Sequence, residues 1–117
     1  MIGQLLVGLI AVLHVYSLVL EMFLWDKPYG LKAFGNSLEK AQLTKVLAQN
    51  QGLYNGFLAA GLFWALIAPE TYAVALANFF LGCVLVAGIY GGLTASKKII
   101  YIQALPALIT LIVVNIF

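Results

Sequence analysis

The chain has few charged residues, one cysteine, one histidine and no arginine among its 117 residues. A single thiol can neither form an intrachain disulfide nor hold a metal ion by itself, so Cys83 predicts neither feature. With only six lysines and no arginine, the sequence offers no basic face dense enough to bind nucleic acid. It also lacks the nucleophile elbow of serine hydrolases, the histidine motif of zinc enzymes and the P-loop that binds phosphates. We therefore expect no metal, no cofactor and no nucleic-acid partner.

Apolar residues dominate what remains. The hydrophobic fraction is 64%, charged residues make up 9%, and the mean hydropathy is +1.06. Soluble domains carry roughly 25% charged residues, and a chain this short could not hide so much apolar surface from water. The composition predicts an integral protein of the cell (inner) membrane, with the lipid bilayer as its partner.

Four apolar segments are long enough to cross a bilayer as helices, which predicts an all-α, up-down bundle of four transmembrane helices. We expect one domain over residues 1–117. Turn residues predict a loop over 26–35, and Asn36, with Glu39 three residues later, predicts the N-cap of a helix that continues into the second span. The first span has no basic region before it and no small-residue cleavage site after it, so we do not expect a signal peptide. The predicted spans are residues 2–25, 50–68, 71–92 and 99–116.

The lysines predict the orientation of these spans. Every basic residue falls in the first or third predicted loop, and none falls on the opposite side. Because basic residues are retained on the cytoplasmic side of a membrane, both loops should be cytoplasmic and both termini outside the cytoplasm. The six residues are Lys27, Lys32, Lys40, Lys45, Lys97 and Lys98.

Glu21 is the residue that most strongly indicates function. An acid inside an apolar span is costly, so it normally faces protein or a water-filled cavity and has a partner. His14 lies seven residues earlier, two turns away on the same helix face. Side chains of these two types can act as acid and base, so we predict catalytic roles for both.

Hydrogen-bonding side chains at a similar depth in the other spans predict a pocket open to the cytoplasm, with His14 at its floor. Pro106 should kink the fourth helix over residues 102–106 and turn Gln103 toward the bundle. Amides in membrane helices also serve as interhelical contacts, and we weigh both roles equally. The predicted ligand-binding residues are Asn50, Gln51, Asn55, Tyr90 and Gln103.

Small residues recur every four positions in two of the predicted spans, as Gly52, Gly56 and Ala60 and as Gly88 and Gly92. Such stripes let helices approach closely. We expect contacts within the chain from them, although the same stripes could also build a homo-oligomer.

Several strings in the sequence resemble one known family. At His14–Tyr16, Glu21–Trp25 and Asn50–Ala59 the chain resembles the small bacterial four-helix membrane proteins grouped as domain of unknown function 1304. Tyr90–Gly92 and Gln103–Ala107 also fit, so the resemblance covers essentially the whole chain. It implies a four-helix polytopic membrane protein and no established substrate.

Three functions are compatible with these features. The first is a membrane-embedded enzyme or binding protein for a small amphiphilic or lipid-like molecule, which would use Glu21 and His14. The second is a small proton-coupled transporter or channel, which with four spans would require an oligomer. The third is a non-catalytic accessory subunit whose polar residues only join helices.

Overall fold

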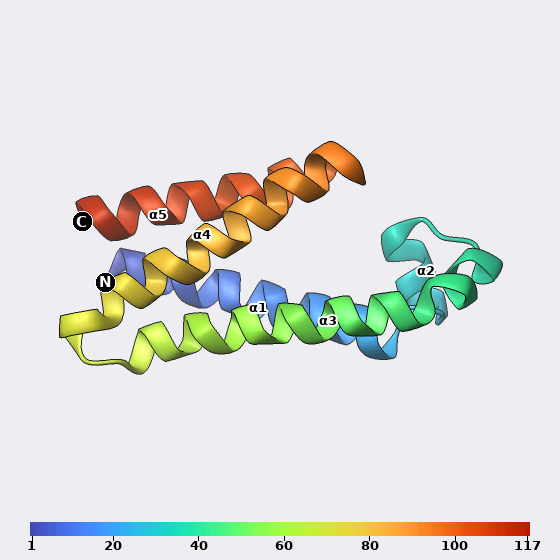
Figure 1. Cartoon of the computed structure of the whole chain (residues 1–117), viewed down its shortest axis with the longest axis horizontal. Coiled ribbons are helices and arrows are strands. Elements are labelled where there is room, and N and C mark those ends of the chain that lie inside the picture. The colour runs from blue at the N-terminus through green and yellow to red at the C-terminus, as the bar shows by residue number, and fades with distance from the viewer. The chain divides into compact units, whose positions relative to one another are not determined.

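The computed structural model describes all 117 residues and consists of helices joined by short connections (Figure 1). The prediction of an all-α fold is confirmed. In chain order the elements are α1 (Ile2–Phe23), α2 (Pro28–Phe34), α3 (Leu38–Ile67), α4 (Glu70–Thr94), the π-helical segment η1 (Ile100–Ala104) and α5 (Leu105–Ile116).

The helices divide between two compact units, and each unit is described by itself. Unit 1 comprises Met1–Ala11 and Leu58–Phe117, and unit 2 comprises Val12–Phe57. Unit 2 therefore contains the second half of α1, all of α2 and the first two thirds of α3. Unit 1 contains α4, η1 and α5 with the remaining turns of α1 and α3.

Two helices are long and apolar enough to cross a membrane. These are α1, with 22 residues, and α4, with 25, and each contains an 18-residue window with a mean hydropathy of 2.1. The predicted second span is the later part of α3, a continuous helix of 30 residues whose first turns are polar. The predicted fourth span is divided between η1 and α5. Of the four predicted spans, the two that correspond to α1 and α4 are therefore long and apolar enough to be candidate transmembrane helices.

The predicted loop over residues 26–35 is wrong in part, because it contains α2. Pro28 stands in the first turn of this helix, where its fixed φ is favourable and its missing N–H is not needed. Gly35 follows the helix with φ 66° and ψ 31°, a left-handed conformation that glycine adopts without a steric penalty. The residues that we interpreted as turn signals are the start and stop signals of a two-turn helix.

The start of α3 also differs by one residue from the prediction. The Ser37 hydroxyl accepts a hydrogen bond from the backbone N–H of Lys40 over 3.1 Å, so Ser37 and not Asn36 caps the helix. The prediction that this helix continues without a break into the second span is confirmed.

Residues 100–104 form a π-helix where we predicted a kink. The backbone N–H of Leu105 donates to the carbonyl of Ile100, five residues earlier, and Pro106 follows in the first turn of α5. A wide π turn accommodates a proline whose ring and missing N–H disrupt a regular helix. Gln103 donates from Nε2 to the carbonyl of Val84 over 3.1 Å, so it faces α4 as predicted.

Unit 1 has one apolar core, to which all of its longer helical segments contribute. At Gly88 the backbones of α4 and η1 come so close that a β-carbon would lie 2.8 Å from the nitrogen of Ala104. The glycine stripe of this helix therefore serves a contact within the chain. The core residues are Val7, Ile10, Ala11, Leu62, Ala65, Ala77, Leu81, Val84 and Ala107.

Candidate functional site

Glu21 and Asn55 form a hydrogen-bonded pair inside unit 2. Asn55 donates from Nδ2 to Oε1 of Glu21 over 2.5 Å, which joins the end of α1 to the middle of α3. Glu21 is buried, with 4% of its surface exposed, and Asn55 is half-buried. Glu21 therefore has a polar partner within the chain, Asn55. The catalytic role of Glu21 and the ligand-binding role of Asn55 stay predictions.

Two glycines of α3 make this pair possible. A β-carbon at Gly52 would lie 2.6 Å from Cγ of Met22 and 3.1 Å from Cβ of Glu21, and one at Gly56 would lie 2.7 Å from Cδ1 of Leu18. The two helices therefore approach most closely beside Glu21. Asn55 is three residues after Gly52, on the same face of α3, so its short side chain can reach the carboxylate.

His14 is also buried, with 6% of its surface exposed. It lies on α1 seven residues before Glu21, roughly 10 Å away along the helix axis at about 1.5 Å per residue. The two side chains therefore lie on one helix face but are too far apart for direct contact. A ligand or another group between them would be needed to connect them.

Asn50 and Gln51 are not brought to the Glu21 carboxylate. Both are exposed on α3, and Asn50 donates from Nδ2 to the carbonyl of Val46, one turn earlier on its own helix, over 2.8 Å. This bond along the helix leaves the amide of Asn50 less available to a ligand than the prediction assumed.

Tyr90 and Gln103 belong to unit 1. Tyr90 is 69% exposed near the end of α4, while Gln103 is half-buried and its amide nitrogen is used by the Val84 carbonyl. The predicted pocket that combines these two residues with Glu21, His14 and Asn55 stays a prediction. No group of three or more histidine, cysteine, aspartate or glutamate residues is arranged to hold a metal ion.

The similarity to known proteins extends over nearly the whole chain. A family model described as "Protein of unknown function (DUF1304)" matches residues 8–115. The chain belongs to this family. This DUF1304 chain is also 32% identical over 106 residues to "Uncharacterized protein YpaA" of Lactococcus lactis subsp. lactis (strain IL1403), which covers 89% of the chain and 88% of the relative. No solved structure matches it.

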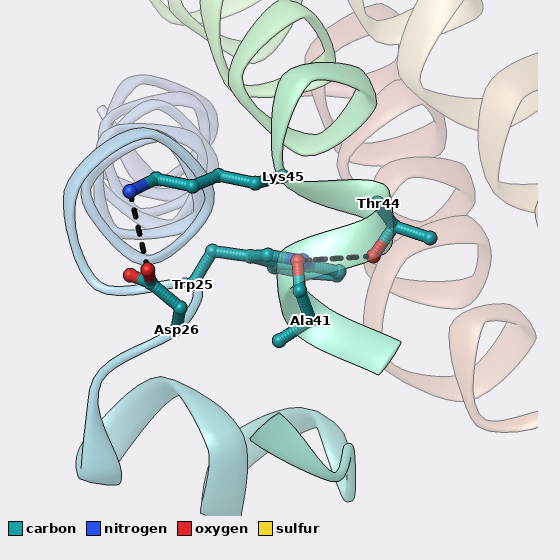
Figure 2. Close-up of polar contacts among 5 residues, drawn as sticks. All are labelled: Trp25, Asp26, Ala41, Thr44 and Lys45. Carbon is teal, nitrogen blue, oxygen red and sulfur yellow. Dashed lines mark hydrogen bonds and ion pairs between the residues drawn. The ribbon is translucent and has the colours of Figure 1, made fainter. Parts of the chain in front are cut away.

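A second polar cluster in unit 2 of this DUF1304 protein, which the sequence analysis missed, begins four residues after Glu21. Figure 2 shows Trp25 and Asp26, which follow α1, beside Thr44 and Lys45 of α3. Trp25 donates from Nε1 to the Thr44 hydroxyl over 3.1 Å, and Lys45 Nζ lies 3.1 Å from Oδ2 of Asp26. The hydrogen bond from Lys45 lowers the pKa of Asp26 below its usual range.

The same cluster fixes α2. Tyr29 of α2 and Tyr16 of α1 are joined through their hydroxyls, and the rings of Trp25 and Phe34 pack with centroids 4.7 Å apart. The sequence analysis used Lys45 only to predict orientation and assigned no contact to Trp25 or Tyr29. The available signal was the pair of opposite charges on Asp26, just after α1, and Lys45, in the early part of α3.

Proposed function

We propose that this DUF1304 protein is a four-span integral membrane protein with both termini outside the cytoplasm. The apolar composition of α1 and α4 supports this proposal, and so does the exposure of their large apolar side chains. Leu5 and Leu9 of α1 are 62% and 53% exposed, and Phe79 and Val86 of α4 are 66% and 68% exposed. Soluble proteins rarely leave such surfaces to water, whereas lipid would cover them. The later part of α3 and the η1–α5 segment supply the other two spans.

Within this membrane protein, the proposed function is to bind, and by acid–base chemistry to transform, a small amphiphilic or lipid-like molecule at Glu21. The observation that carries the proposal is the hydrogen bond between buried Glu21 and Asn55. A carboxylate in a membrane span normally has a charged or multiple polar partners. Here Glu21 forms no ion pair, and one amide donor leaves most of its acceptor capacity unused.

The polar headgroup of an amphiphile would use that remaining capacity. His14, buried on the same face of α1, is the second group that the proposed chemistry requires. The apolar residues around both suit a ligand with a hydrocarbon part, because the bilayer itself would deliver such a molecule to the site.

Chromatography and mass spectrometry of molecules that co-purify with the protein test this proposal. We expect the wild type to retain a small amphiphile in stoichiometric amount and Glu21→Gln to lose it. Asn50→Ala is the matched control, because Asn50 bonds only its own helix, and it should retain the molecule. Retention by Glu21→Gln equal to that of the wild type would contradict the proposal.

A non-catalytic accessory subunit is the second candidate, and a specific observation favours it. The amides of Gln103, Asn78 and Asn115 all bond other helices of the chain, and the last two exchange hydrogen bonds of 3.0 and 2.7 Å between α4 and α5. Under this alternative the Glu21–Asn55 bond is one more interhelical contact. Glutamine can accept the same bond, so Glu21→Gln would then be silent both in stability and in the cell.

A further inference from the structure

Unit 1 contains a cavity of about 420 Å³ that none of the predicted site residues lines. Its walls come from the beginning of α1, the end of α3, the beginning of α4 and the end of α5. The volume lies within the range of pockets that bind small molecules, roughly 300–1,000 Å³. The cavity shares no residue with the Glu21 site, so it would serve a separate ligand.

One face of α4 gives the cavity a polar end and an apolar wall. Glu70, Ala73, Val74 and Ala77 all line it, and their spacing of three, four and seven residues places them in one stripe along the helix. The stripe extends roughly 10 Å along the axis at about 1.5 Å per residue. Val114 of α5 lines the cavity as well. The Glu70 carboxylate is thus followed by a row of apolar side chains, and this row is about as long as a short alkyl chain.

The Glu70 side chain is exposed, and its carboxylate is open to a ligand. It forms no ion pair and no side-chain hydrogen bond. The lysines of unit 1, Lys97 and Lys98, follow the far end of α4, roughly 36 Å from Glu70 along a helix of 25 residues. At that distance salt screens most of the attraction, because the Debye length at physiological ionic strength is about 8 Å. The beginning of a helix favours an acid, and Glu70 lines the cavity together with Met1 and Gln4 from the beginning of α1.

We propose that this cavity binds an alkylammonium group, with the cationic head at Glu70 and the alkyl tail along Ala73, Val74 and Ala77. The group could be a free amphiphile or the headgroup of a choline lipid. The proposal goes beyond the function suggested for Glu21 and does not depend on it.

Equilibrium dialysis of hexyltrimethylammonium against the full chain in a neutral detergent tests the site. We expect Glu70→Gln to weaken binding about tenfold, the effect of losing one charged contact of roughly 1.4 kcal/mol. Glu39→Gln, which removes an exposed acid of α3 in unit 2, should leave binding unchanged. Uncharged hexanol should bind both variants as it binds the wild type. Equal affinity of Glu70→Gln and Glu39→Gln for the cation would overturn the proposal.

Two further measurements locate the ligand and identify its source. Ala73→Phe should fill the cavity and abolish binding of both probes. If that variant does not fold, methyl NMR of the wild type decides: the Ala77 methyl must shift on titration while those of Ala41 and Ala48, buried in unit 2, do not. In nanodiscs, weaker apparent binding in phosphatidylcholine than in phosphatidylethanolamine, which is also zwitterionic, assigns the site to a choline headgroup, and equal binding assigns it to a free alkylammonium. A shift of Ala41 equal to that of Ala77 contradicts the site.

Discussion

Gly52 lies directly against Glu21, so that a β-carbon at position 52 would be 3.1 Å from Cβ of the glutamate. The same β-carbon would be 3.3 Å from the backbone oxygen of Leu18. The distance between α1 and α3 at the candidate site is therefore set by the absence of a side chain. Asn55 reaches Glu21 because the helices are this close.

Replacing Gly52 by alanine should destabilise the protein and lengthen the Glu21–Asn55 contact. Overpacking at a close helix contact costs about 1–3 kcal/mol, which exceeds the roughly 1 kcal/mol that alanine contributes over glycine in a helix. Gly82→Ala is the control, because no atom lies within 4 Å of its β-carbon position. We expect Gly82→Ala to be neutral or stabilising in reversible unfolding in mixed micelles. Equal stability of the two variants would show that the helices are not in close contact at Gly52.

The Glu21–Asn55 pair should show energetic coupling in a double-mutant cycle. Glu21→Leu and Asn55→Leu each leave a polar partner without its bond, and the double variant removes both, so we expect a coupling of about 0.5–3 kcal/mol. The matched cycle pairs Glu21→Leu with Asn50→Leu, where the amide bonds its own helix and the coupling should be near zero. Similar coupling in both cycles would indicate a general effect of helix hydropathy.

Much of this pair could be predicted from the sequence, because an acid in an apolar segment requires a partner and few polar residues were available to supply one. The failures have local causes. Proline and glycine, as at Pro28 and Gly35, occur both in turns and at helix ends, so the sequence alone does not distinguish the two. The helix between them is held by contacts of Trp25 and Tyr29 with other parts of the chain. Asn50 lies little more than one turn before Asn55, but its amide donates to the backbone carbonyl of Val46. Residue spacing does not reveal that the backbone competes with a ligand for this amide.

The Asp26–Lys45 ion pair should make stability depend on pH in acid. Because its folded-state pKa is lowered, the Asp26 carboxylate stabilises the fold above its unfolded pKa, near 4. This contribution decreases as the pH falls below that value and is lost below the folded-state pKa. The stability difference between the wild type and Asp26→Asn should therefore shrink between pH 6 and pH 3. In a Lys45→Met background the same comparison should show a smaller change, and added salt should reduce it in the wild type.

A reporter fused after Phe117 should be active only if it requires the environment outside the cytoplasm. The reason is that all six lysines lie between the first and second predicted spans or between the third and fourth. The reciprocal control is an insertion beside Lys97, where a reporter that works only in the cytoplasm should be active. Activity of the cytoplasmic reporter after Phe117 would reverse the proposed orientation.

Pro106→Ala should change the helix register at η1. The π turn relieves the clash between the proline ring and the preceding turn, so with alanine residues 100–116 can form a regular helix, and Gln103 then turns away from the Val84 carbonyl. Gln103→Leu should therefore cost about 1 kcal/mol in the wild type and little in the Pro106→Ala background. Thr110→Val is the control: the Thr110 hydroxyl donates to the backbone carbonyl of residue 106, which alanine retains, so its cost should be equal in both backgrounds. An equal cost of Gln103→Leu in the two backgrounds would show that the π turn does not depend on the proline.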